Sequence, residues 1–170
     1  MRGRAAALVL AIAAAVVVAD QVSKARVRAV LTQEGTSIPV IGRLVRLTYT
    51  RNTGAAFGML PGNRVMFIVV SLVVLSGIGA YLWRYRPTRT WIIVALGLVA
   101  GGAFGNLVDR VAFGRVTDFI QIPFDFPVFN IADSSIVVGV AMLVWWLFFG
   151  PAPPEAQGKD TAPDTTDGGS

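Results

Sequence analysis

VMFIVVSLVVLSGIGAYLW (65–83) and TWIIVALGLVAGGAFGNLV (90–108) are two stretches of the chain without a single charged residue. Each contains about 19 residues and would be about 28 Å long as an α-helix, which matches the hydrocarbon core of a bilayer. Both stretches are therefore predicted to be membrane-spanning helices.

Two further apolar stretches raise the number of predicted spans to four. One runs from Ala5 to Ala19, and the other begins after Asp133, contains the aromatic run WWLFF and ends at Gly150 and Pro151. Aromatic residues and a Gly-Pro pair are typical of a helix end at a membrane interface. The sequence predicts an all-α membrane protein with transmembrane helices at about 5–22, 64–83, 90–108 and 134–150.

Composition supports this class and limits the number of domains. At 170 residues, 54% hydrophobic and 15% charged, the chain is too apolar for an ordinary soluble protein and long enough for one domain. Residues 1–150 are predicted to form that membrane-embedded domain. The segment 151–170 is rich in Pro, Gly, Asp and Thr. It cannot bury enough apolar surface to offset its ordering entropy, so a disordered C-terminal tail is predicted.

The first apolar stretch has a second interpretation. MRGR followed by an apolar run that ends in Val-Val-Ala also fits a cleavable signal peptide with a cut after Ala19. The three other predicted spans favour retention of this helix, because an even number of helices brings both termini to one side of the membrane.

The connections between the spans predict a small β-platform but leave the orientation open. In RLVRLTYT (43–50), Val45, Leu47 and Tyr49 would lie on one side of a strand. The WRYRPTR connection (83–89) carries three arginines, which is a cytoplasmic signal, yet the 20–64 connection carries seven Lys or Arg. Charge bias therefore does not decide which side faces the cytoplasm.

The missing residue types narrow the possible chemistry. The chain has no histidine and no cysteine. This excludes disulfides, thiol nucleophiles, Ser-His pairs and most zinc sites, so no metal or cofactor is expected. The net charge of +5 comes from arginines beside apolar runs, which favours membrane lipids over nucleic acid as partners.

The third predicted span ends in a polar group that follows a stripe of glycines. Gly97, Gly101 and Gly105 are spaced four apart, so one helical face would allow close approach of a neighbouring helix. Asn106 and Asp109 follow on one face, and Arg110 could pair with Asp109. This group is either an interfacial cap with a snorkelling arginine or part of a polar pocket at the bilayer edge.

Two aspartates in the connection before the last span are the candidate catalytic residues. An extended reading of RVTDFIQI (115–122) places Asp118 on an apolar face, which is costly for a carboxylate unless it is protonated, paired or catalytic. Asp133 in NIADSSIVV is predicted to N-cap the fourth helix, although Asn, Ser or Thr would serve as well there. If the two carboxylates meet, one is protonated and one ionised, and the pair can activate water for peptide hydrolysis.

Five sequence blocks, in this order, resemble those of the signal peptidase II family, also called lipoprotein signal peptidase. The blocks are DQVSK (20–24), NTGAAFG (52–58), GGAFGNLVDR (101–110), VTDF (116–119) and FNIAD (129–133). The resemblance covers roughly residues 5–150 and leaves the tail outside. Individually the third block is the specific one, but the ordered set of five is highly specific.

The resemblance implies an aspartic endopeptidase of the bacterial inner membrane, with four spans and both termini cytoplasmic. A monomer is expected only because the sequence shows no apparent soluble assembly surface. Its site would lie near the outer leaflet, beneath an extracytoplasmic β-platform and a short surface helix. The implied substrate is a diacylglyceryl-modified prolipoprotein, cut just before the lipidated cysteine. Because DQVSK (20–24) belongs to the family blocks, cleavage at Ala19 is not expected.

The resemblance also assigns roles to individual residues. It implies that Asp118 and Asp133 are catalytic and that a group of polar residues lines the site and holds the substrate or the dyad. These are Asn52, Asn106, Asp109, Arg110 and Asn130. Supporting roles fall to Asp20, Lys24, Gly54 and Phe129.

Two functions of other kinds are alternatives. A transporter or proton-conducting subunit would also retain rare acids in a membrane, but near mid-bilayer and on broken helices. A Ser-Lys peptidase could use Ser23 and Lys24, yet adjacent residues point in different directions on a helix.

Overall fold

The structure is a computed structural model that describes residues 3–42, 44–54, 63–124 and 126–150. The predicted tail, 151–170, and most of the NTGAAFG block (52–58) lie outside the described residues. The elements, in chain order, are α1 (Arg4–Val30), β1 (Ser37–Ile41), β2 (Val45–Asn52), α2 (Arg64–Tyr85), α3 (Thr90–Phe113), β3 (Val116–Gln121) and α4 (Ile131–Phe149).

All four helices are long and apolar enough to cross a membrane, which confirms the four predicted spans. The described ranges contain no further helix, so the expected short surface helix is not among them. α1 extends to Val30, well beyond the predicted end near 22. The prediction ended it where charges interrupt the apolar run, but Asp20, Lys24 and Val27 share a buried face of the continuing helix.

α3 is the inner helix of the bundle. In its spanning stretch 67% of the residues are buried, against 6–11% in the other three helices. The outer helices expose large apolar side chains such as Val65, Leu147 and Phe148. In water this surface would be costly, whereas in a bilayer it contacts lipid tails.

Glycines allow α3 to pack closely between α1 and α4. A Cβ atom at Gly97 or Gly101 would lie 2.7 Å from the side chain of Ile12 or Val16 on α1. On the opposite side, a Cβ at Gly102 would collide with the carbonyl oxygen of Ala132 at the start of α4. The predicted glycine face is confirmed, and these contacts fix how far α1 and α4 stand from α3.

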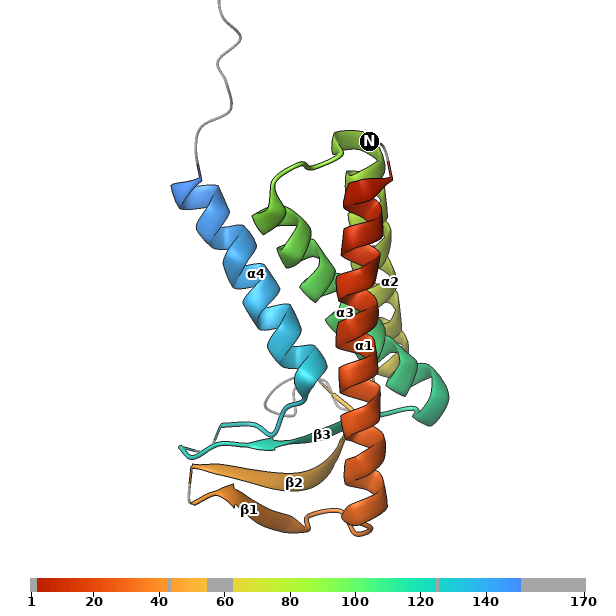
Figure 1. The fold of residues 1–170 in the computed structure, drawn as a ribbon. Helices are drawn as coiled ribbons and strands as arrows, with labels where there is room; N and C mark the ends of the chain where they lie inside the picture. The colour runs from red at the N-terminus through yellow and green to blue at the C-terminus, as the bar shows by residue number, and fades with distance from the viewer. Residues whose placement is uncertain (1–2, 43, 55–62, 125, 151–170) are drawn as a thin grey trace, which may run out of the picture.

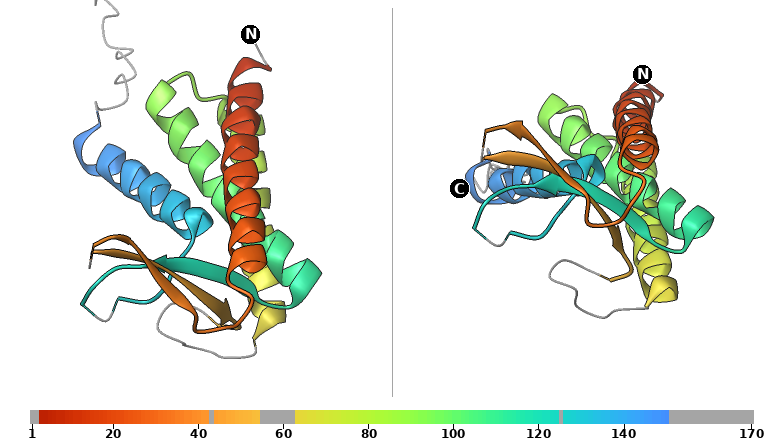
Figure 2. Two further views of the ribbon diagram at one scale, coloured as in Figure 1. Left: turned by 60° about the horizontal axis from the view of Figure 1, so that its bottom comes forward. Right: turned by 90° about the horizontal axis from the view of Figure 1, so that it is seen from below.

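The three strands form one antiparallel sheet in the order β1-β2-β3. The sheet lies across one end of the helix bundle, below the start of α4 and beside the last turns of α1 (Figures 1 and 2). Tyr49 and Phe119 pack with Val27 and Leu31, so the sheet is tied to α1 by a small apolar cluster. The predicted platform is thereby confirmed, with β2 two residues further along the chain than expected.

α4 begins earlier than predicted, and its cap is a different residue. The N-cap is Asn130, which has an extended backbone. Its side-chain oxygen accepts the backbone N–H of Asp133, and the Asp133 carboxylate accepts the backbone N–H of Asn130. Asp133 is therefore not the N-cap but the third helical residue of a capping box. The prediction was wrong because Ile131 and Ala132 can form the first helical turn once Asn130 caps it.

Candidate active site

Asp118 is buried in β3 and held by two asparagine amides. Its Oδ2 atom accepts a hydrogen bond from Asn52 Nδ2 at 2.9 Å, and its Oδ1 atom accepts one from Asn130 Nδ2 at 2.6 Å. Only 2% of the residue is exposed. β2 supplies Asn52 and the start of α4 supplies Asn130, so this carboxylate is fixed from both sides.

Asp133 lies in the first turn of α4 and is held in a similar way. Its Oδ1 atom accepts from Asn106 Nδ2 at 2.7 Å, and its Oδ2 atom accepts from the backbone N–H of Asn130 at 3.2 Å. Asn130 therefore contacts both carboxylates, one through its side chain and one through its backbone. This shared residue brings the two predicted catalytic aspartates to one place.

Burial raises the pKa of Asp118 to about 7, and the negative charge of Asp133 adds to the rise. The amides of Asn52 and Asn130 oppose it, because they stabilise the ionised form. Near neutral pH, Asp118 can therefore hold or release a proton. A carboxyl group in this range suits general acid and base catalysis.

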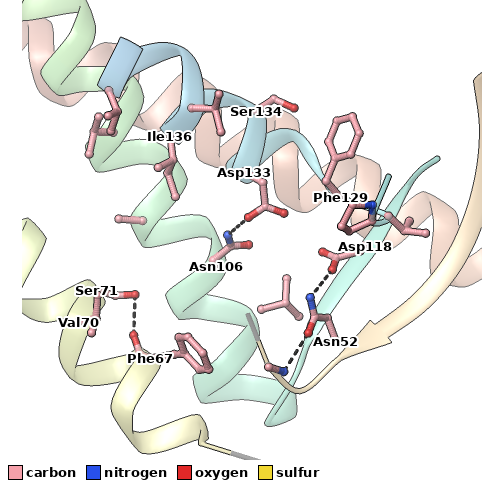
Figure 3. Close-up of a pocket in the computed structure, with 18 of the residues that line it drawn as sticks. Asn52, Phe67, Val70, Ser71, Asn106, Asp118, Phe129, Asp133, Ser134 and Ile136 are labelled. Atoms are coloured by element: carbon pink, nitrogen blue, oxygen red, sulfur yellow. Dashed lines mark hydrogen bonds between the residues drawn. The ribbon is translucent and has the colours of Figure 1, made fainter. Parts of the chain in front are cut away.

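Both aspartates open into a pocket of about 730 Å³. Figure 3 shows the two carboxylates directed into the same part of this pocket, with Asn106 and Asn52 beside them. Away from this polar end the walls are mostly apolar and come from α2, α3 and α4. They include Val70, Val74, Val99, Ile136, Val137 and Val140. The pocket thus joins a polar end at the sheet to an apolar cleft between spanning helices.

Arg110 lies at the polar end of the pocket. The sequence suggested that it pairs with Asp109, but the structure gives it other partners. Its guanidinium stacks over the Phe67 ring at 4.7 Å and reaches the carbonyl oxygens of Asn106 and Gly54 at 3.4 and 3.5 Å. Neighbouring residues on a helix point in different directions, which explains the wrong pairing. Gly54 in turn donates its N–H to Asn52 Oδ1 at 2.8 Å.

Asp109 instead joins a buried group formed with Asp20 and Lys24. The Lys24 ammonium lies 2.8 Å from Asp20 Oδ2 and 3.3 Å from Asp109 Oδ2, and all three residues are fully buried. Asp109 is not among the residues that line the pocket, and its Oδ2 atom accepts the backbone N–H of Thr117, beside Asp118. Of the two expected roles, holding the substrate or holding the dyad, this position suits the second. Ser23 donates to the backbone oxygen of Asp20 at 2.8 Å, so Ser23 and Lys24 do not form a nucleophile pair.

Phe129 supports the site through its backbone. Its N–H and carbonyl oxygen pair with Ile120, and the oxygen also accepts from Phe119, so residue 129 runs beside β3. Its ring lines the pocket and meets Phe126 edge to face at 5.7 Å. This pairing fixes the short path from Asp118 to the α4 cap.

Sequence reasoning missed two residues of the site. Gln21 donates to Asp20, to Asp109 and to the carbonyl oxygen of Gly105, which links α1 to α3. Its place inside DQVSK (20–24) was a usable signal. Phe67, whose ring lies beneath Arg110, had no such signal in the sequence, because it is one apolar residue among many in a predicted span. Within the described residues, no group of three or more acidic side chains is arranged to hold a metal ion.

Comparison with known proteins agrees with the geometry. A family model described as signal peptidase (SPase) II matches residues 12–149. The lipoprotein signal peptidase of Pelotomaculum thermopropionicum is 43% identical over 136 residues, which are 80% of this chain and 88% of the relative. That of Geobacillus thermodenitrificans is 43% identical over 156 residues, covering 90% of this chain and 97% of the relative.

Two solved structures are similar to the chain in fold and sequence. A structure described as a bacterial membrane enzyme at 2.3 Å resolution superposes with a TM-score of 0.78 at 36% identity, covering 82% of this chain and 87% of that one. A second, at 1.9 Å resolution, gives a TM-score of 0.76 at 36% identity, with coverage of 84% and 94%. Since the family model spans most of the sequence and the relatives align over most of their length, the chain belongs to the signal peptidase II family of membrane peptidases.

Proposed function

We propose that the chain is an aspartic endopeptidase that removes signal peptides from prolipoproteins by cutting just before a diacylglyceryl-modified cysteine. The observation that carries the proposal is the shared contact of Asn130 with Asp118 and Asp133 at the polar end of one pocket. Two carboxylates that share one proton can activate water without forming a covalent intermediate.

In the proposed reaction the dyad begins with one proton, held on Asp118. Asp133 takes a proton from water as the water oxygen attacks the scissile carbonyl carbon, and Asp118 gives its proton to the carbonyl oxygen. The C–N bond of the resulting diol then breaks. The leaving nitrogen takes the proton from Asp133, and one hydroxyl of the diol returns a proton to Asp118. The raised pKa of Asp118 supports its role as the initial acid.

The shape of the pocket supports a lipid-anchored substrate. Its apolar walls come from the spanning helices α2, α3 and α4, and its polar end is formed by residues of the sheet and the start of α4. A diacylglyceryl chain among those helices would hold the scissile bond beside the dyad without moving the lipid into water. Asn52, Asn106 and Arg110 line this end and carry amide or guanidinium groups suited to an extended peptide backbone, while the buried Asn130 amide holds Asp118.

The direction of the chain supports an orientation in the bacterial inner membrane. α1 starts and α4 ends at the end of the bundle opposite the sheet (Figure 1). We place both termini in the cytoplasm and the sheet, with the dyad, at the outer leaflet. This position brings the site to the side on which lipoproteins emerge.

The test uses the full chain in vesicles of phosphatidylglycerol and phosphatidylethanolamine. The substrate is a synthetic prolipoprotein segment whose lipobox cysteine carries diacylglyceryl, and the products are identified by mass spectrometry. We expect one cut before the lipidated cysteine, no cut in the unlipidated peptide and loss of cutting in Asp118→Asn and Asp133→Asn. Glu34→Gln, at an exposed acid on the sheet side, is the matched control.

Two results would contradict the proposal. Full processing by either Asp→Asn variant would remove the dyad from the mechanism. Proton flux across the vesicles without any cleavage would favour the transporter or proton-conducting alternative.

A further inference from the structure

Lys24 is buried in the bundle with three polar partners from two helices. Its ammonium contacts Asp20 Oδ2 at 2.8 Å and Asp109 Oδ2 at 3.3 Å, and it donates to Asn106 Oδ1 at 3.0 Å. None of its surface is exposed. A buried ion pair by itself contributes little net stability, because desolvation offsets the attraction. The arrangement is therefore better understood by what each partner holds.

The two carboxylates each hold the backbone next to a catalytic aspartate. Asp20 Oδ1 accepts the N–H of Ala132 at 3.0 Å, one residue before Asp133. Asp109 Oδ2 accepts the N–H of Thr117 at 2.9 Å, one residue before Asp118. Asp20 on α1 and Asp109 on α3 thus hold the backbone beside Asp133 and Asp118. The Lys24 ammonium contacts both of these acids.

The third partner acts on the dyad through one side chain. Asn106 presents its oxygen to Lys24 and its nitrogen to Asp133, at 2.7 Å. A primary amide can donate only through nitrogen, so a cation beside the oxygen determines which end faces the carboxylate. Asn130 Nδ2 also donates to this oxygen, at 3.3 Å. Without Lys24, the Asn106 oxygen therefore keeps this longer, neutral contact and loses the shorter, charged one that helps to hold its N–H groups on Asp133.

From these contacts we propose that Lys24 is the positioning residue of the dyad: through Asp20, Asp109 and Asn106 it sets where Asp118 and Asp133 lie relative to each other. The inference rests on the proposed role of the two aspartates and adds a residue that touches neither substrate nor dyad. A small displacement of reacting groups can cost about 100-fold in rate. Replacement of Lys24 should therefore lower kcat far more than it changes KM.

A double-mutant cycle separates this role from a contribution to folding. The variants are Lys24→Met, Asn106→Ala and the double variant, each assayed in vesicles below its thermal unfolding midpoint. We expect Lys24→Met to lower kcat about 100-fold with KM within about twofold. In the Asn106→Ala background the same change should lower kcat less than about tenfold, because residues acting through one contact are not additive. Arg26→Met, at an exposed cation on the same helix, is the matched control.

Lys24→Met leaves two buried acids facing each other and could fail to fold. The cycle is then run with Asp20→Asn/Lys24→Met in place of Lys24→Met, which keeps the net charge of this buried group unchanged. Fully additive losses, or a kcat within about threefold of wild type in a folded Lys24 variant, would overturn the inference.

A second readout does not depend on activity. The chain has four asparagines, of which Asn52, Asn106 and Asn130 lie at the site and Asn63 is exposed at the start of α2. With ¹⁵N-labelled asparagine side chains, we expect Lys24→Met to shift or broaden the Asn106 and Asn130 amide signals and leave Asn63 unchanged. Unchanged Asn106 signals would refute the positioning role. Absence of cleavage by the wild-type protein would instead refute the proposed function, so the two failures are distinguishable.

Discussion

The side-chain amide of Asn130 lies 2.6 Å from the Oδ1 atom of Asp118. The same residue caps α4 with its side-chain oxygen and gives its backbone N–H to Asp133. One residue therefore starts the fourth helix, orients one carboxylate and fixes the other. The catalytic geometry and the helix start cannot be changed independently at this position.

Replacing Asn130 should separate its two roles. Asn130→Ser keeps an oxygen that can cap the helix but removes the amide donor to Asp118, so we expect near wild-type stability and a large loss of kcat. Asn130→Ala removes both, and should in addition lower the free energy of unfolding by about 1 kcal/mol. Thermal unfolding and peptidase assays on the two variants check this. Equal stability of Ser and Ala variants would show that the cap contributes nothing.

The raised pKa of Asp118 should make both activity and stability depend on pH. Activity should fall as pH rises through about 7, because the dyad then loses the proton that serves as acid. The pH–rate profile of the wild-type enzyme measures this. An alkaline limb several units above pH 7 would contradict it.

The raised pKa of Asp118 also makes the free energy of unfolding depend on pH. The folded-state pKa of about 7 lies above the unfolded value of 3.8, so the folded state binds the proton more tightly. The stabilisation of the folded state by this proton is fully present below about pH 4 and is lost as pH rises through 7. Asp118→Asn should therefore be more stable than wild type at pH 8, by a few kcal/mol at most, and should show little gain at pH 4. Unfolding midpoints at the two pH values test the sign.

Gly102 should be sensitive to a single added methyl group. A Cβ atom there would collide with the Ala132 carbonyl oxygen and approach Ile136 to 2.7 Å, so α4 must move and carry Asp133 with it. We expect Gly102→Ala to lower both the unfolding midpoint and kcat. Gly77→Ala is the control, since no atom lies within 4 Å of its added Cβ and alanine favours the helix. Equal effects of the two substitutions would be evidence against the close contact.

Arg110→Lys should show that the flat guanidinium matters as well as its charge. Lysine retains the positive charge but cannot stack over the Phe67 ring and reach two carbonyl oxygens together. We expect about a tenfold loss in kcat/KM, corresponding to about 1.4 kcal/mol. Steady-state kinetics with Phe67→Leu alongside would reveal whether the ring carries part of that loss. Wild-type kinetics in Arg110→Lys would mean that charge alone suffices.

The sequence alone determined the membrane class, the four spans, the glycine face and the two candidate aspartates. Those features depend on local quantities: runs of uncharged residues, spacing along a helix and the cost of a carboxylate on an apolar strand face. Only the tertiary structure decided which polar groups meet. The network around Lys24 joins residues from α1 and α3 and from the backbone beside Asp118 and Asp133.

Local reasoning failed where partners come from distant elements. It paired Arg110 with its neighbour Asp109, and it assigned the cap of α4 to Asp133 rather than Asn130. A hydrogen bond requires its two atoms at about 3 Å with the right direction, and that depends on how closely α1 and α4 approach α3 across the glycines. The sequence specifies the spacing of those glycines, but the pairing of buried charges follows only once the helices are packed.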